Sequence, residues 1–469
     1  MKQSRTAIKE LTAAYRAVLK HAFIAMVGTV AVIGGASAGE RTLVAEDDLY
    51  PAQDGMVLDI QDYQVKNLHD YAEALFFVSG SRGPLTVGAG SVFKNNVVES
   101  GVFSVSTDGT VLTIKPGTMF VGNHALADGG AIANFGVVKI QDSWFEGNTA
   151  QLTPDENGNF TVVAVDDIPV GGGALALGAV SGSDIASVTG TMFKENISGR
   201  NGGAIGTRLG KDAKNNAARL NIAAVFDGNH AYDNGGAIYN TFYANNGLGL
   251  GDGVTVTGKF VKNTAGKNGG AIFNDGALDK TGTAGGVMTI NDSVFSENNA
   301  GGFGGGVFNT GTLTVNGGVF EKNTAMVGGA ISTGYNDKGV GKGSAEITGA
   351  TFANNTAGYG GGAIANYGSL KIDNSTFANN KVTQAIEQDG WNNRNLNSSV
   401  DGGGALFLGS ASSTYVADLN QVKFVGNEAT TNGGAIATRA DWINSELGSL
   451  NSKTDAPENY DPSKDYLVK

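Results

Sequence analysis

Apolar and polar residues alternate with a period of two along short segments of this 469-residue chain. Val138 and Ile140 alternate with Lys139 and Gln141, and the same pattern returns at Leu370–Asp373. This alternation is typical of β-strands with one buried face and does not fit helical spacing. Asn-x-Gly triplets separate several of the segments, and both residue types tolerate the left-handed backbone of a tight turn. The pattern therefore predicts many short strands joined by tight turns.

Two tetrapeptides recur in the same order ten times between Phe120 and Ile436. The first is Phe-x-x-Asn, and the second is Gly-Gly-Ala-Ile or a close variant of it. The shortest spacing between successive copies is 25 residues, as from Phe120 to Phe145. Phe93 and Asn96 form an eleventh Phe-x-x-Asn that has no Gly-Gly partner. The repeated phenylalanines are Phe120, Phe145, Phe193, Phe226, Phe260, Phe295, Phe320, Phe352, Phe377 and Phe424. The repeated asparagines are Asn123, Asn148, Asn196, Asn229, Asn263, Asn298, Asn323, Asn355, Asn380 and Asn427.

Self-similarity at this period predicts a solenoid, and short strands with tight turns fit one coil of a parallel β-helix. Stacked coils would repeat at about 4.8 Å and form a rod on the order of 50 Å long. The phenylalanine column would fill the interior, and the asparagine column would form a ladder of side-chain amides. The two glycines would allow a sharp corner and close backbone approach. A leucine-rich horseshoe and a β-propeller fit less well, because their repeat signatures are missing. The predicted fold is all-β, a parallel β-helix solenoid with an N-terminal cap.

The chain divides into four predicted regions. Residues 1–38 read as a secretory signal peptide, because a basic start precedes an apolar run from Ala22 to Ile33 and an Ala36-Ser-Ala38 cleavage site. A membrane anchor is the alternative, but this run is too short to span a bilayer of ~30 Å. Residues 39–92 would cap the open end of the solenoid, residues 93–440 would form the repeats, and residues 441–469 are a polar C-terminal segment.

Residues are inserted at two places in the repeat, and a stacked solenoid would project them as two fringes of loops. One site lies between the two tetrapeptides, and the other follows the Gly-Gly-Ala strand. Within the loop at Lys381–Asp401, Trp391 and Arg394 are candidate binding residues, because an aromatic anchor among polar side chains suits recognition. The inserted ranges are Thr149–Val170, Lys381–Asp401, Arg208–Ala223, Thr241–Asp252, Gly276–Gly286 and Tyr335–Ser344.

The sequence contains no recognisable catalytic, metal or cofactor motif. Asp166 and Asp167 are the adjacent acidic pair within the repeats, but they lie in an inserted loop, where a solvated pair is the simpler reading. His124 and His230 each follow the Asn of a Phe-x-x-Asn, at a position that is Thr in other copies. A tolerated substitution explains them without catalysis. A carbohydrate-active enzyme would need two or three carboxylates from neighbouring coils in one groove. We expect no enzyme activity and no cofactor.

The composition limits the cellular compartments and the classes of partner that fit this chain. The chain has no cysteine, so disulfides and thiolate metal sites are excluded. Its formal net charge is −12. Removal of residues 1–38 takes away five Lys/Arg and one Glu, which leaves 27 basic and 43 acidic residues and a charge of −16. Such a surface argues against nucleic-acid binding. We expect a chain exported from the cytoplasm.

The ten ordered pairs of Phe-x-x-Asn and Gly-Gly-Ala-Ile resemble the repeats of the polymorphic outer membrane proteins of chlamydiae, over roughly residues 93–440. The resemblance implies a right-handed parallel β-helix that forms the passenger of an autotransporter. It also implies adhesion to host cells or another extracellular surface, with self-association as a further property. Binding would involve the loops or the exposed faces of the Gly-Gly-Ala strands.

This chain departs from that family in two ways. It lacks the cysteines common in the chlamydial proteins, and about thirty residues follow the last repeat, whereas even a small barrel of eight strands at ~10 residues each needs more. We therefore expect either a truncated passenger, held at the outer membrane by a barrel missing here, or a secreted relative. The expected function is that of a non-enzymatic adhesin-like passenger, secreted or at the outer membrane surface. A carbohydrate-active β-helix lyase or hydrolase is the alternative.

Overall fold

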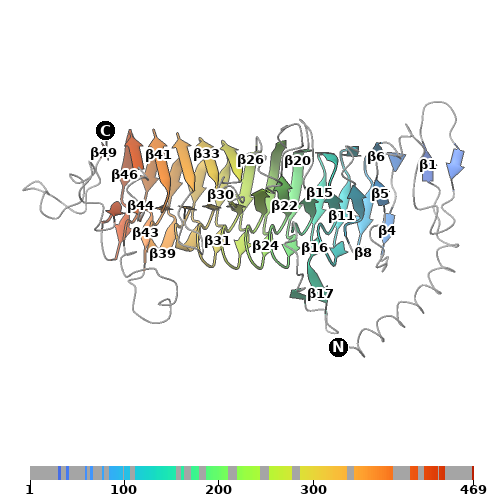
Figure 1. Cartoon of the computed structure of the whole chain (residues 1–469), viewed down its shortest axis with the longest axis horizontal. Helices are drawn as coiled ribbons and strands as arrows, with labels where there is room; N and C mark the ends of the chain where they lie inside the picture. The colour runs from blue at the N-terminus through green and yellow to red at the C-terminus, as the bar shows by residue number, and fades with distance from the viewer. Residues whose placement is uncertain are drawn as a thin grey trace, which may run out of the picture.

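A computed structural model describes residues 84–98, 100–105, 111–154, 160–162, 171–178, 186–209, 219–242, 253–276, 286–334, 343–383, 402–409, 417–430 and 433–438. It also describes the short strands β1 (Val30–Val32), β2 (Gly39–Arg41), β3 (Asp59–Ile60), β4 (Gln64–Lys66), β5 (Phe76–Val78) and β49 (Leu467–Val468). None of these residues forms a helix. They build three long parallel sheets that run along a rod (Figure 1). The predicted all-β fold, a parallel β-helix, is confirmed.

Each coil starts with a strand that we call the long strand, which reaches nine residues in three of the coils. Its residues alternate between buried and exposed, so one face joins the core. Long strands of successive coils pair in parallel and in register, for example Val138 with Ala186 and Ile140 with Val188. The long strands are β6 (Leu85–Val87), β10 (Val111–Ile114), β14 (Val137–Gln141), β20 (Ala186–Lys194), β23 (Arg219–Asp227), β26 (Gly253–Val261), β29 (Val287–Asn291), β33 (Thr312–Asn316), β37 (Ser344–Thr348), β41 (Ser369–Asp373) and β45 (Ala417–Asn420).

The second strand of each coil, the Phe strand, carries the phenylalanine of Phe-x-x-Asn and belongs to the same 22-stranded sheet. In β20, β23 and β26 the long strand and the Phe strand are continuous. The separate Phe strands are β7 (Val92–Lys94), β11 (Met119–Val121), β15 (Trp144–Glu146), β30 (Val294–Ser296), β34 (Val319–Glu321), β38 (Thr351–Ala353), β42 (Thr376–Ala378) and β46 (Val422–Val425).

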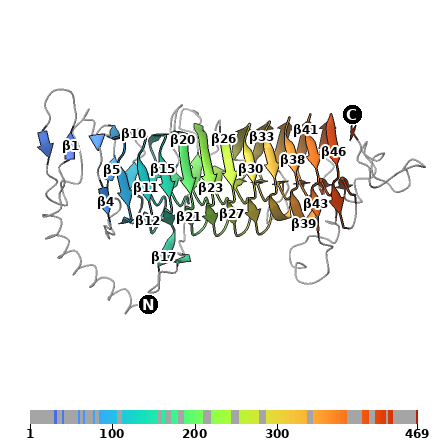
Figure 2. The same cartoon turned by 180° about the vertical axis from the view of Figure 1, so that it is seen from behind.

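A short strand, the corner strand, follows the Asn of each Phe-x-x-Asn. These strands form an 11-stranded parallel sheet that appears as one row along the rod (Figures 1 and 2). They are β8 (Val97–Val98), β12 (His124–Ala125), β16 (Thr149–Ala150), β21 (Ile197–Ser198), β24 (His230–Ala231), β27 (Thr264–Ala265), β31 (Asn299–Ala300), β35 (Thr324–Val327), β39 (Thr356–Gly360), β43 (Lys381–Val382) and β47 (Glu428–Ala429).

The last strand of each coil, the Ile strand, begins at the apolar residue that ends Gly-Gly-Ala-Ile. Together with β5, these strands form a 12-stranded parallel sheet. They are β9 (Phe103–Val105), β13 (Ile132–Asn134), β19 (Leu175–Leu177), β22 (Ile205–Leu209), β25 (Ile238–Phe242), β28 (Ile272–Asn274), β32 (Val307–Asn309), β36 (Ile331–Thr333), β40 (Ile364–Asn366), β44 (Leu406–Leu408) and β48 (Ile436–Thr438).

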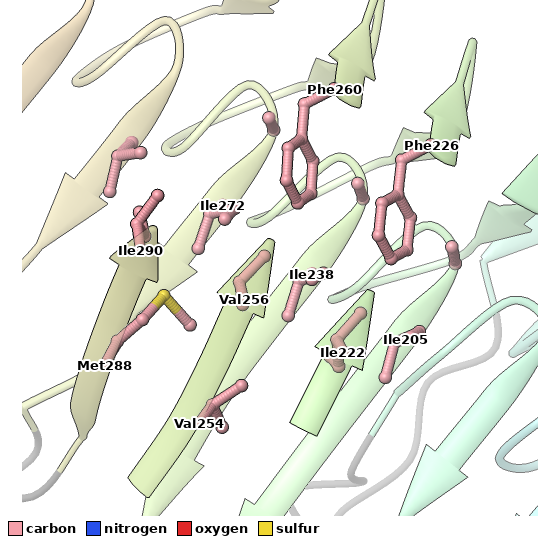
Figure 3. Packing of buried hydrophobic residues seen from close by; sticks show 14 of the residues in the cluster. Ile205, Ile222, Phe226, Ile238, Val254, Val256, Phe260, Ile272, Met288 and Ile290 are labelled. Atoms are coloured by element: carbon pink, nitrogen blue, oxygen red, sulfur yellow. The ribbon is translucent and has the colours of Figure 1, made fainter. Parts of the chain in front are cut away.

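One continuous apolar core fills the space between the three sheets, from Phe76 to Ile436. Each coil contributes the Phe of its Phe strand, two inward residues of its long strand and the first residue of its Ile strand. Figure 3 shows this layer for neighbouring coils, where Phe226 and Phe260 face Ile238 and Ile272. Because every coil buries its apolar face against the next, the stability of the rod depends on the contacts between neighbouring coils.

The inserted ranges predicted from the sequence are too wide. Lys381 and Val382 form β43, so the corner strand precedes this insertion. Arg208 lies in β22 and Ala223 in β23, which leaves 210–218 between those two strands. The predicted insertions are too wide because some strands extend beyond the tetrapeptide motif from which they were recognised. Near Thr149, an inserted antiparallel hairpin consists of β17 (Leu152–Pro154) and β18 (Phe160–Val162).

Parallel pairing also extends before Phe93. The strands β3 and β4 pair with β6 and β7, and β5 pairs with β9. At the other end, β49 pairs antiparallel with β46. Most of the predicted signal peptide, much of the cap and most of residues 441–469 lie outside the described residues. Within the described part of the chain, no helix is long and apolar enough to cross a membrane.

Candidate binding surface

The asparagines of Phe-x-x-Asn form one column, in which side-chain amides bond from coil to coil. Asn263 Nδ2 donates to Asn298 Oδ1 at 3.0 Å and to the carbonyl oxygen of Phe226 at 3.0 Å. Asn263 Oδ1 accepts from both Asn229 Nδ2 and the Asn229 backbone N–H. All four bonding positions of the amide are therefore occupied. The Asn column is buried, 0 % exposed at every member except Asn427 at 7 %, so it holds the coils together and cannot contact a partner.

The phenylalanines of the same motif form a second buried column. Neighbouring rings stack nearly parallel, with centroids 4.6 Å apart between Phe295 and Phe320 and 5.3 Å apart between Phe377 and Phe424. Phe93 and Asn96 extend both columns by one coil, although they lack a Gly-Gly partner. Both fixed residues of the motif thus belong to the interior.

The two variable residues of Phe-x-x-Asn form a corner ridge, in which all except Ser296 are at least partly exposed. The second variable residue adopts a left-handed backbone in all eleven copies, with φ between 53° and 64°. Several of these residues are not glycine, such as Glu195, Lys262 and Lys322, and they are exposed. The left-handed turn points them away from the core. The corner ridge therefore combines a uniform backbone with side chains that differ in charge from coil to coil.

The Gly-Gly pair marks the tightest contact between coils. Gly269 has φ of +66°, a region that disfavours other residues. Gly270 has ordinary backbone angles, but a side chain there would overlap the backbone of Gly305 and Asn299 in the next coil. The first glycine thus turns the chain, and the second allows the coils to approach. Gly434 lies in the last described coil, and a methyl group added to it would lie 3.2 Å from Asn427 O.

The Ile strands do not offer the exposed face expected from the sequence. In β28, β32 and β44 all three residues are buried, including the outward-facing Phe273, Phe308 and Phe407. These aromatics belong to a second apolar cluster outside the main core. The sequence does contain a sign of this burial, because a large aromatic residue directly follows the Ile position in several copies of the repeat. These three strands therefore expose little side-chain surface on their outward face.

A polar group lies beside this second cluster. Tyr239 OH donates to Asp275 Oδ2 at 2.7 Å, and Thr241 Oγ1 contacts the same oxygen at 3.4 Å. Burial, together with the nearby Asp275 charge, raises the pKa of Tyr239 well above its usual value. The phenol therefore stays protonated and acts as a hydrogen-bond donor, which fixes Asp275 at the end of the Ile strand.

The two histidines of the corner sheet bond to threonines of the next coil. His124 Nδ1 lies 2.6 Å from Thr149 Oγ1, and His230 Nδ1 lies 2.7 Å from Thr264 Oγ1. Burial lowers the pKa of His124 from 6.5 to about 4, and it also lowers the pKa of His230. Both rings are therefore neutral at neutral pH, and their bonds to threonines of the next coil account for them structurally.

Acid is expected to destabilise the rod through His124. The unfolded chain binds this proton near pH 6.5, and the folded chain binds it only near pH 4. The contribution of His124 to the free energy of unfolding is therefore complete above pH 6.5. It falls by up to about 3 kcal/mol as the pH falls towards 4. Urea unfolding of the parent and of His124→Thr, each at pH 7 and pH 4, should show a smaller acid loss for the variant. An equal loss in both proteins would contradict this role.

Two carboxylates from neighbouring coils come close at Glu346 and Asp373. Lys371 Nζ lies between them, 2.8 Å from Glu346 Oε1 and 3.3 Å from Asp373 Oδ2. Hydrogen bonds from Asn420 and Lys371 lower the pKa of Asp373. The three side chains are at least partly exposed on the outer face of the 22-stranded sheet. This is a surface ion cluster in which one lysine pairs with both acids.

The remaining predicted site residues lie outside the described residues. These are Trp391 and Arg394 of the inserted loop and the acidic pair Asp166 and Asp167. Among the residues that the structure does describe, no group of three or more His, Cys, Asp or Glu side chains could hold a metal ion. The sequence alone did not indicate Trp144 as a candidate residue, and the structure places it half-buried on the outside of β15.

Stacked coils, a buried amide ladder and a stacked aromatic column define a parallel β-helix repeat protein. Three segments, residues 223–241, 259–275 and 421–439, match the family model described as the Chlamydia polymorphic membrane protein repeat. Each segment contains one complete Phe-x-x-Asn and Gly-Gly-Ala pair. The predicted resemblance is confirmed for these three segments, which lie within the parallel β-helix. Comparison with curated proteins and with solved structures gave no match.

Proposed function

We propose that this chain is a non-enzymatic, adhesin-like passenger, exposed on the outer surface of a cell or secreted, that binds a host or matrix surface. One observation carries the proposal: the fixed residues of Phe-x-x-Asn are buried, whereas its variable residues, Ser296 apart, are at least partly exposed and form the corner ridge. A rigid rod that presents different side chains at regular intervals is suited to recognition of a partner surface. The repeats of the polymorphic membrane protein type agree with a surface location.

Contact with the partner is assigned first to the inserted loop after β43. This loop contains Trp391 and Arg394, residue types that often dominate binding energy. Thr383 and Gly402 are the described residues on either side of the loop. Since β43 pairs with β39 and β44 pairs with β40, deletion of residues 384–401 would remove none of these paired residues. Self-association of the rods is a second proposed property, which the purified protein would show as oligomers in solution.

Beads coated with the protein should adhere to host cells, and deletion of residues 384–401 is expected to reduce adhesion about tenfold. Deletion of residues 210–218, from the other insertion site, is the matched control and should leave adhesion unchanged. Circular dichroism should first show the same β signal in all three proteins. Equal adhesion of the parent and the 384–401 deletion would assign contact to the corner ridge. Parent beads that adhere no better than uncoated beads would end the proposal.

A further inference from the structure

The outer face of the 22-stranded sheet carries an uncharged column of small polar side chains, the polar column. Its members pair in register through five successive coils and are at least partly exposed. The same column is charged on either side, with Lys139 before it and Glu346 after it. The polar column consists of Ser187, Asn221, Thr255, Thr289 and Thr314.

A second uncharged column runs beside it, two residues further along each long strand. Thr189, Ala223, Thr257, Asn291 and Asn316 occupy this position in the same five coils. Asn316 Nδ2 donates to Asn291 Oδ1 at 2.9 Å, which links two coils at the surface. In a chain with a net charge of −12, this area offers hydrogen-bond donors and acceptors without ionic attraction.

An apolar column lies on the same face, on the Phe strands. Met119, Trp144, Met192 and Val225 pair in register in four successive coils. Phe145 points into the core, so its neighbour Trp144 faces outward. Trp144 Nε1 donates to Glu146 Oε2 at 3.0 Å, which fixes the indole on the surface. Met119 is 37 % exposed.

The polar and apolar columns run side by side where β20 and β23 each form one continuous strand. Ser187 and Met192 share β20, and Asn221 and Val225 share β23. The face therefore has an apolar strip and a hydroxyl- and amide-bearing strip, both parallel to the long axis of the rod. An uncharged glycan has the complementary chemistry, because a pyranose ring presents C–H groups on its faces and hydroxyls around its rim. Aromatic side chains provide large, rigid contact area for such a ring.

We propose that this face binds an extended, uncharged polysaccharide that lies along the rod, with one sugar ring stacked on Trp144 and hydroxyls bonded to the polar column. The inference rests on the proposed adhesin-like function and names its ligand class. The polar column itself carries no basic residue. On the same face, Lys259 continues the apolar column after Val225, and Lys194 pairs with Glu146 beside Trp144. The two strips share the coils of β20 and β23, and the coil that carries Trp144 directly precedes them.

Affinity electrophoresis of the full chain tests this directly. Gels should contain one of three neutral polymers, hydroxyethyl cellulose, laminarin or galactomannan, with the anionic hyaluronan as comparator. We expect retardation by at least one neutral polymer and none by hyaluronan. Trp144→Ala should weaken binding about tenfold, which corresponds to about 1.4 kcal/mol, and Trp144→Phe should restore part of it. The double variant Thr255→Glu, Thr289→Glu should lose binding, because it adds charge to the polar column.

Thr324→Glu is the matched control, since Thr324 is exposed on a corner strand away from this face; it should bind like the parent. Retardation by no neutral polymer, or retardation that the Trp144 and threonine variants leave unchanged, would overturn the inference. Adhesion of the same proteins to cells separates the two proposals. A parent that adheres to cells but binds no neutral polymer defeats only the glycan inference. A parent that does not adhere defeats the proposed function itself.

Discussion

Gly270→Ala is expected to destabilise the rod by about 3 kcal/mol or more. The new methyl group would overlap the backbone of Gly305 and Asn299 in the next coil. Asn299 is paired in β31, and the Gly305 N–H donates to the carbonyl oxygen of Gly328, so these backbone atoms cannot move aside as the tip of a flexible side chain can. The coil spacing would therefore have to change locally, which strains the Asn column and the Phe column on both sides. Urea unfolding followed by circular dichroism measures the loss.

Gly434→Ala provides the matched control for this prediction. Gly434 occupies the same place in the repeat, but it lies in the last described coil, and its added methyl would lie 3.2 Å from Asn427 O. We expect a loss of about 1 kcal/mol or less there. Losses of equal size at Gly270 and Gly434 would show that the second glycine is needed for its own coil and not for the approach of the next one.

Asn263→Ala is expected to cost about 3 kcal/mol, because it breaks the buried amide column in the middle of the rod. The change removes the acceptor of the Asn229 amide and backbone N–H, and it also removes the donor to Asn298 and Phe226. Each of these groups is buried, so water cannot replace the lost bond without opening the coil. The midpoint and slope of urea unfolding report the size of the effect.

Asn221→Ala is the comparison for Asn263→Ala. Asn221 is exposed on the outer face of β23, where water can solvate its amide. We expect Asn221→Ala to lower the free energy of unfolding by no more than about 0.5 kcal/mol. If both variants unfold at the same urea concentration as the parent, the amide column contributes nothing measurable to stability.

The sequence was sufficient to predict the fold because the same constraint repeats in every coil. A Phe that must stack on another Phe and an Asn that must bond to another Asn leave a visible period in the chain. Alternation along Val137–Gln141 indicated the long strand directly, since its inward residues are apolar and its outward residues are polar. The corner strands were less visible, because two residues are too few to show any alternation.

The surface was harder to predict than the interior. The sequence suggested that the Gly-Gly-Ala strands expose a binding face, yet Phe273, Phe308 and Phe407 are buried on the outward side of that sheet. Alternation does not distinguish an outward residue that meets solvent from one that packs against other parts of the chain. Trp144 was overlooked for a related reason. Its importance depends on Met119 and Met192 in neighbouring coils, which lie 25 and 48 residues away in the chain.

The Asn column also gives the rod an electrical direction. Every ladder carbonyl Oδ1 that accepts from its neighbour faces the preceding coil, as Asn148 Oδ1 does towards Asn123 and Asn298 Oδ1 towards Asn263. Side-chain amide dipoles therefore add along the axis, in the way that peptide dipoles add along an α-helix, and each bond polarises the next. The partial positive charge lies at the C-terminal end of the column, near Asn427. Two ends built from the same motif thus differ in potential.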